Sequence, residues 1–276
     1  MYRNHLSPPQ FPAPWAADWG EDNYGLWMTC ALHRARQIFR WIRPGTFMMG
    51  AAAEKGGRSP WLGRVTQHRV TLSKGFWLAD TAVTQEMWTA AMGENPACFT
   101  GAGLPVERVS WHDAQAFIRQ LNTLLPGFRA RLPFEAEWEY ACRAGTATPF
   151  SFGNEVTPEQ VNYNGRYPCS RESQGGSGVP GLYRRETVPV KSLPCNSWGM
   201  YEMHGNVREW CQDCWQPDLT ADPAVDPQGP VRGYARLVRG GSWADDAWSA
   251  RSACRESCSP DFRSAGIGLR LAVNCL

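Results

Sequence analysis

The stretch from Arg143 to about Tyr234 constrains the fold most, because it is mostly irregular, with few helix or strand signals and many turns. Irregular stretches of this length inside one domain are uncommon and are normally functional or held by metal ions. The chain also contains 14 tryptophans, 27 glycines and 21 prolines, which favours many turns pinned by buried rings. The candidate anchors are Trp198, Trp210, Trp215 and Trp243. We therefore expect a loop-rich domain with few regular elements.

Regular elements are predicted around that stretch. Helical signals cover residues 84–92, 110–125 and 133–142. Thr84 and Gly93 suit the two caps of the first helix, and Ser110 with Asp113 resembles a capping box for the second. The predicted apolar face of the second helix is Ala114, Phe117, Ile118, Leu121 and Leu124. Strand-like pieces are residues 39–42, 46–49, 68–72, 236–239 and 268–272.

Charge and hydropathy exclude several classes of function. The formal net charge is +2 with mixed signs, so no nucleic-acid partner is expected. No run approaches the ~18 apolar residues of a transmembrane helix, so no membrane insertion is expected. The polar, proline-rich residues 1–23 show no signal-peptide pattern. This favours a cytoplasmic location and leaves signal-independent export open.

The chain has ten cysteines, and most are expected to be reduced core residues. Cys211-x-x-Cys214 and Cys254-x-x-x-Cys258 have spacings that zinc sites use, and together they could form a four-thiolate site. We favour the alternative in which the thiols face different ways, because the aromatics of "EWCQDCW" suit a cysteine that packs as a small hydrophobe.

Four motifs resemble the formylglycine-generating enzyme, or sulfatase-modifying factor, superfamily. They are "RLPFEAEWEYACRAGT" (131–146), "NSWGMYEMHGNVREWCQD" (196–213), "RGGSW" (239–243) and "GIGLRLA" (266–272). The resemblance spans roughly residues 40–272 and implies an α+β fold, a variant of the C-type lectin-like fold. Phe134 departs from the pattern, because the family usually has a threonine there. The expected organisation is an N-terminal extension, 1–24, and a single domain, 25–276.

The resemblance also bears on catalysis. Enzymes of this superfamily oxidise a substrate cysteine with a copper-binding cysteine pair, and the matching positions here are Asp245 and Ala250. Because Cu(I) needs soft ligands, neither copper binding nor catalysis is expected. A copper- or thiol-dependent oxidase of protein cysteine is kept as the alternative. The sulfoxide-synthase branch, which holds iron on three histidines, is disfavoured because the five histidines form no HxxxH or HxH cluster.

The segment 239–272 resembles the variable region of ligand-binding proteins that retroelements diversify. In that group a reverse transcriptase misreads template adenines, so certain asparagine codons scatter while the codons between them stay fixed. The fixed frame, which would supply the packing, would be residues 251–253, 260–261, 263 and 267–270. The scattered, ligand-binding positions would point to solvent, and they would be Ala244, Asp245, Asp246, Ser249, Cys254, Ser257, Cys258, Phe262, Ser264, Ala265 and Gly266. None of them is Trp, Met, Lys, Gln or Glu, as such codons require.

The family resemblance further implies a structural calcium ion. Its ligands would be the side chains of Glu202 and Glu209 and the carbonyls of Gly205 and Val207, and oxygen ligands in an irregular loop suit Ca²⁺. A purely structural Glu209, hydrogen-bonded to the loop backbone, is equally open.

The sequence thus predicts a non-catalytic display protein for an unidentified macromolecular partner. We expect that partner to be a protein, because an acidic and aromatic patch at 245, 246 and 262 suits a protein surface.

Overall fold

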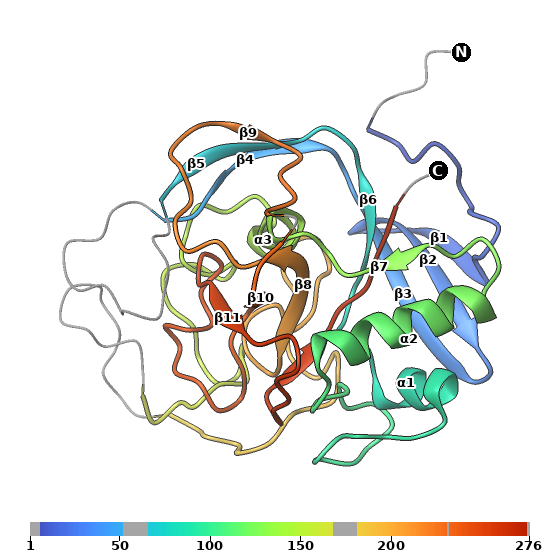
Figure 1. Cartoon of the computed structure of the whole chain (residues 1–276). Helices are drawn as coiled ribbons and strands as arrows, with labels where there is room; N and C mark the ends of the chain where they lie inside the picture. The colour runs from blue at the N-terminus through green and yellow to red at the C-terminus, as the bar shows by residue number, and fades with distance from the viewer. Residues whose placement is uncertain (1–5, 52–65, 168–180, 231, 275–276) are drawn as a thin grey trace.

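The computed structural model describes residues 6–51, 66–167, 181–230 and 232–274, which form an α+β fold of three sheets and three helices (Figure 1). One sheet has six strands in the order β1-β2-β3-β6-β13-β7. Its strands are β1 (Asp18–Asp22), β2 (Gly25–Leu32), β3 (Ala35–Ile42), β6 (Phe76–Ala79), β7 (Ala130–Arg131) and β13 (Ala272–Asn274). Every pairing in this sheet is antiparallel.

Two smaller sheets complete the scaffold. The four-stranded sheet has the order β11-β10-β8-β12, with β12 parallel to β8 and the other pairs antiparallel. Its strands are β8 (Arg208–Cys214), β10 (Arg236–Arg239), β11 (Glu256–Cys258) and β12 (Ile267–Leu269). The three-stranded sheet consists of β4 (Gly45–Met49), β5 (His68–Leu72) and β9 (Ala224–Val225).

The three predicted helices are confirmed as α1 (Gln85–Met92), α2 (Trp111–Leu124) and α3 (Glu135–Arg143). Thr84 and Gly93 cap α1, and Ser110 and Asp113 form a reciprocal capping box on α2. Leu124 was wrongly placed on the apolar face of α2, because it lies in the last turn and is 40% exposed. At α3 Phe134 supplies no side-chain cap. The Asp213 carboxylate instead accepts the Glu135 backbone N–H at 2.8 Å, and the Glu137 carboxylate accepts the Phe134 backbone N–H at 2.8 Å.

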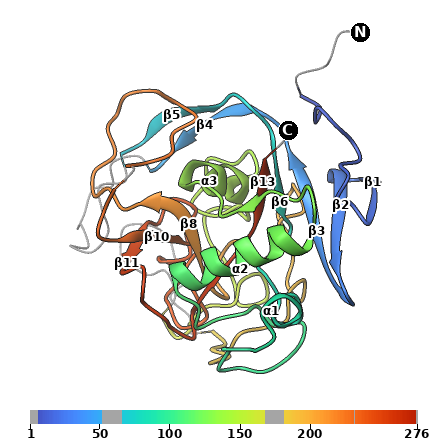
Figure 2. The same ribbon diagram turned by 45° about the vertical axis from the view of Figure 1, so that its right-hand side comes forward.

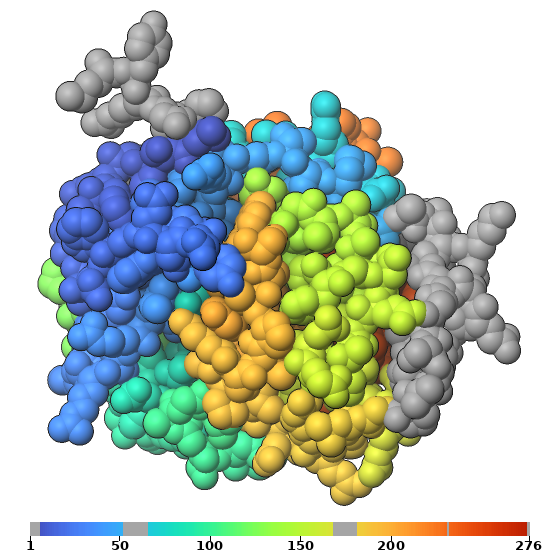
Figure 3. Space-filling view, turned by 180° about the vertical axis from the view of Figure 1, so that it is seen from behind, coloured from blue at the N-terminus to red at the C-terminus, as the bar shows by residue number. Residues whose placement is uncertain are grey.

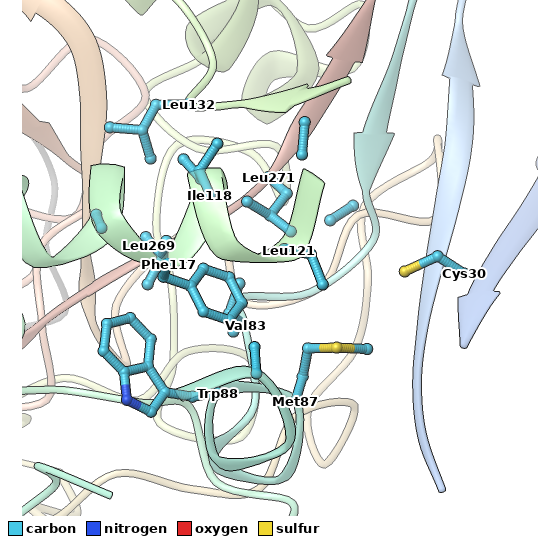
Figure 4. Packing of buried hydrophobic residues seen from close by; sticks show 14 of the residues in the cluster. Cys30, Val83, Met87, Trp88, Phe117, Ile118, Leu121, Leu132, Leu269 and Leu271 are labelled. Atoms are coloured by element: carbon cyan, nitrogen blue, oxygen red, sulfur yellow. The ribbon is translucent and has the colours of Figure 1, made fainter. Parts of the chain in front are cut away.

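Two apolar clusters hold the layers together. α1 and α2 pack against the six-stranded sheet, and the Trp88 ring stacks on Phe117 with ring centroids 4.9 Å apart (Figure 4). α3 lies between the three-stranded sheet and the strands β8 and β10, with every residue buried (Figure 2). Because α3 is buried on all sides, its glutamates need ion-pair partners within the protein.

Several predicted strands are confirmed and others are corrected. Residues 268–272 are not one strand, because the chain leaves β12 and enters β13 in another sheet. β8 lies within the stretch expected to be mostly irregular. The predicted boundary at residues 24–25 falls inside a hairpin, because β1 pairs with β2 along its whole length. No helix in the described part of the chain is long and apolar enough to cross a membrane.

Candidate recognition surface

The segment 239–272 leaves the four-stranded sheet and returns to it. It starts at the end of β10, adds β11 to the outer edge of β10, and comes back as β12 beside β8 (Figure 1). Gly240 and Gly241 turn the chain out of β10 with φ of 97° and 68°, a region that favours glycine. A Cβ at Gly241 would lie 3.0 Å from the backbone of Ala250. The non-periodic middle is therefore a loop excursion with both ends fixed by one sheet.

Buried arginines tie this excursion to α3. Arg239 is ion-paired with Glu139 and donates a hydrogen bond to the carbonyl of Ser252 at 2.9 Å. Arg255 donates to both carboxylate oxygens of Glu135, at 2.5 and 2.9 Å. Both arginines are 1% exposed. Because a buried charge without a partner is very costly, these pairs determine where the backbone of the segment lies.

The scattered positions differ in their exposure. The exposed ones are Ala244, Asp246, Ser257 and Phe262, the last at 49%. The half-buried ones are Asp245, Ser249, Cys258, Ser264 and Ala265. Nine of the eleven therefore reach solvent at least in part, as a ligand-binding surface requires, although their role in binding stays a prediction.

Cys254 and Gly266 do not reach the surface, contrary to the prediction that all scattered positions face solvent. Cys254 is 3% exposed, and burial raises the pKa of its thiol to about 12. A Cβ at Gly266 would lie 2.9 Å from the Ser242 hydroxyl oxygen, so a larger residue requires that neighbour to shift. Cys254 lies two residues before β11 and Gly266 lies directly before β12, so both belong to the layer that supports the loop.

The predicted frame is buried in most places. Arg251, Ser252 and Ala253 are at most 7% exposed, and residues 267–270 are fully buried. Asp261 and Arg263 were wrongly expected to pack inside, since both are exposed. Arg263 instead forms a two-pronged ion pair with Asp113 of the α2 capping box, at 2.7 and 2.9 Å. The frame thus holds the loop to the start of α2 from outside.

Arg208 organises the charged part of this surface, and sequence reasoning missed it. Its guanidinium lies 2.6 Å from Asp245 and 2.8 Å from Glu256. Asp245 also accepts hydrogen bonds from the backbone and hydroxyl of Ser242, at 2.8 and 2.7 Å. Burial raises the pKa of Glu256, and Arg208 partly offsets that rise. Arg208 gave no signal, because it lies in a motif interpreted as a calcium loop.

The two positions predicted to match the catalytic cysteine pair, Asp245 and Ala250, carry no thiol. Asp245 is engaged in the ion pair above, and Ala250 is fully buried. After Cys254, the next thiol along the chain is that of Cys258, and burial raises its pKa to about 11. Burial also raises the pKa of Cys211 well above its usual value. These thiols remain protonated near neutral pH, and soft metal ions bind thiolates.

Metal binding has little support in this geometry. Within the described ranges, no three or more His, Cys, Asp or Glu side chains are grouped as a metal site requires, and the four cysteines are not gathered into such a group. Glu209 is ion-paired with Arg270 at 2.8 Å and accepts the Trp138 indole N–H at 2.7 Å. Its oxygens are therefore committed, and Glu209 does not fit the role of a calcium ligand. The alternative expectation of backbone hydrogen bonds for Glu209 is also replaced by these side-chain contacts. Calcium binding by this loop stays an untested prediction.

His204 supports the loop from beneath. Its Nδ1 lies 2.7 Å from the carbonyl oxygen of Ala250, and its Nε2 accepts a hydrogen bond from the Ser151 backbone N–H at 3.1 Å. The ring is therefore neutral, with its proton on Nδ1. Burial, reinforced by the charge of Arg143, lowers the pKa of His204 to about 4.

A loop-rich α+β scaffold whose C-terminal segment leaves and re-enters one sheet defines a C-type lectin-like domain of the formylglycine-generating-enzyme type. The chain belongs to the family of the sulfatase-modifying factor enzyme 1-like domain, whose model matches residues 33–275.

The relatives of this chain carry two kinds of name. Formylglycine-generating enzyme of Streptomyces coelicolor is 40% identical over 177 residues, which cover 61% of this chain and 52% of that enzyme. The chain spans about half the length of this and another leading curated relative. Treponema denticola variable protein 1 is similar in structure, with a TM-score of 0.71 and 26% identity over 90% of this chain and 98% of that one. PvdO from Pseudomonas aeruginosa has a TM-score of 0.68 and 26% identity, covering 94% and 98%.

Proposed function

We propose that this protein is a non-catalytic display protein whose segment 239–272 is diversified by a retroelement and binds a macromolecular ligand. The observation that carries the proposal is that most scattered positions reach solvent, while most frame positions are buried and the segment is held by the buried ion pairs of Arg239, Arg255 and Arg270. Surface substitutions usually change stability by less than ~0.5 kcal/mol, so such a segment can vary without unfolding. The likeness to a protein named a variable protein supports the same proposal.

The partner we propose is a protein. The exposed side chains of Asp246 and Phe262 combine charge with an aromatic ring. Half-buried Trp248 follows Asp246 by two residues, and its ring centre lies 3.4 Å from the Arg251 guanidinium. Aromatic residues and arginine are enriched where protein surfaces meet.

Two libraries of the full chain test the proposal. One randomises Ala244, Asp246, Ser257 and Phe262, and the other randomises the same number of frame positions, Ser252, Ala253, Ile267 and Leu269. We expect most members of the first library to fold and few members of the second, as measured by protease resistance on a display platform. Equal survival of the two libraries would remove the distinction between display and frame. The gene offers an independent check: a near-copy of the coding segment with adenines at the scattered positions, beside a reverse transcriptase gene.

The alternative is oxidation of a protein cysteine, which the names of several relatives keep open. We expect the purified protein to leave a cysteine-containing sulfatase peptide unchanged with or without copper, because Asp245 and Ala250 supply no thiolate. Mass spectrometry of the peptide detects the aldehyde product. The double variant Asp245→Cys, Ala250→Cys, which restores the thiol pair, is the matched control. Aldehyde formed by the unmodified chain would overturn the proposal.

A further inference from the structure

A cavity of about 800 Å³ opens on a face that segment 239–272 hardly reaches. Its lining comes from the β1–β2 turn, the β3–β4 connection, α3 and the residues after 196. Figure 3 shows these regions meeting: the N-terminal strands in blue adjoin the amber segment near residue 200, which adjoins the yellow-green segment near 140–150. The red C-terminal segment is barely visible in that view. The cavity is therefore separate from the proposed display surface.

Aromatic rings form much of this cavity. Tyr24, Trp41, Tyr140 and Trp198 all line it, and the rings of Tyr140 and Trp198 meet edge to face with centroids 4.8 Å apart. Trp41 is held by a hydrogen bond from its indole N–H to the carbonyl of Leu6 at 2.7 Å. Tyr24 is 41% exposed at the rim. Such rings offer flat apolar faces that a ligand can stack on.

A hydroxyl group and a close approach mark the floor of the cavity. The Tyr140 hydroxyl lines the cavity and has no hydrogen-bond partner among the described residues. A Cβ at Gly45 would lie 2.1 Å from that hydroxyl oxygen, so only glycine leaves room for it. A phenol hydroxyl without a partner can both donate a hydrogen bond to a ligand and accept one from it.

The turn at the rim is fixed before any ligand arrives. Asp22 accepts the backbone N–H of Tyr24 at 2.8 Å and binds Arg40 through two hydrogen bonds of 2.9 and 3.0 Å. The Arg40 guanidinium lies 4.9 Å from the centre of the Tyr24 ring. Asp22 is thereby neutralised, and the other lining charges, Glu21 and Arg43, are of opposite sign. The site has no excess charge that would select an anion or a cation.

We infer that this cavity binds a neutral saccharide, which stacks a sugar ring on Tyr24 or Trp198 and hydrogen-bonds to the Tyr140 hydroxyl. A sugar ring presents an apolar face of C–H groups together with hydroxyls that both donate and accept, and the cavity offers both complements. A preformed concave site with a few placed polar groups is the usual form of a small-ligand site.

An array of neutral and charged oligosaccharides, probed with the labelled full chain, tests the inference. We expect binding to neutral oligosaccharides, and we then titrate the strongest of them by calorimetry. Tyr140→Phe removes only the hydroxyl and should weaken binding by roughly two- to tenfold, the value of one neutral hydrogen bond. Tyr24→Ala should weaken it more, by roughly tenfold or above, because a stacking ring is lost.

Matched controls separate this site from folding defects and from the display surface. Tyr234 is fully exposed outside the cavity, so Tyr234→Phe and Tyr234→Ala should leave saccharide binding unchanged. The triple variant Asp246→Ala, Ser257→Ala, Phe262→Ala should also keep saccharide binding. Loss of protein binding by this variant would not bear on the saccharide site. Absence of oligosaccharide binding, binding restricted to charged sugars, or binding that Tyr24→Ala and Tyr140→Phe leave intact would each overturn the inference.

Discussion

The α1–α2 layer and the segment 239–272 are both anchored inside the protein, but by different interactions. α2 buries Phe117 and Leu121 completely, in an apolar cluster that follows helical spacing. The segment buries Arg239, Arg255 and Arg270, each against a carboxylate of α3 or β8. Apolar packing depends on the shape of every neighbouring side chain. Ion pairs at a few fixed points hold a backbone path and leave the side chains between them free to differ.

The largest expected effect comes from breaking one of these buried pairs. Arg270→Met leaves the carboxylate of Glu209 buried without its cation, and we expect the free energy of unfolding to fall by about 3–5 kcal/mol. Urea denaturation measures the change. Arg263→Met is the matched control, because it breaks an exposed ion pair of the same segment and should cost about 0–1 kcal/mol. Equal losses in the two variants would mean that buried ion pairs do not hold the frame.

Apolar anchors of the segment should rank by burial. Ile267→Ala creates a cavity at a fully buried position and should lower the free energy of unfolding by about 2–5 kcal/mol. Trp243 is only half-buried, against the expectation of a buried anchor. Its ring meets Phe99 edge to face and stacks on Tyr183, with centroids 5.4 and 6.1 Å apart, and its indole N–H donates to the Ala265 carbonyl at 2.9 Å. Trp243→Ala should therefore cost less than Ile267→Ala in the same denaturation experiment, and the reverse order would contradict this ranking.

The stability that His204 contributes beneath the loop should depend on pH. Its pKa of about 4 in the folded protein lies below the ordinary 6.5, so the folded state binds fewer protons than the unfolded chain. The associated stability is complete above pH 6.5 and is lost as the pH falls toward 4, up to about 3 kcal/mol in total. Thermal or urea unfolding across this range measures it. His204→Gln can keep both hydrogen bonds without titrating, so a wild-type curve that parallels the variant would exclude His204 as the source.

The smallest effect is expected on the display side. The triple variant Asp246→Ala, Ser257→Ala, Phe262→Ala removes exposed groups and should change the free energy of unfolding by less than about 1 kcal/mol. Chemical denaturation again gives the value without knowledge of the ligand. A loss as large as that of Ile267→Ala would show that the exposed side chains are structural, and the contrast between display and frame would fail.

Local signals predicted the helices well, because their causes are local. Thr84, Ser110 and Asp113 cap helices through groups only a few residues apart. β8 could not be found in the same way, because "REWCQDC" carries no alternation and is made a strand by β10 on one side and β12 on the other. The exposure of the segment was predicted for Asp246, Ser257 and Phe262 and missed for Cys254, since exposure depends on what packs above a residue.

The sequence alone determined the family, the three helices and the absence of thiols at positions 245 and 250, because motifs, caps and residue identity are written in neighbouring residues. Only the tertiary structure decided that Glu135, Glu139 and Glu209 pair with arginines up to 120 positions away. It also decided that Arg208 joins Asp245 to Glu256, and that a turn at Tyr24 meets Tyr140 around one cavity. The role of a buried charge or of a cavity-lining hydroxyl depends on the groups that folding places around it, and no local sequence pattern records those groups.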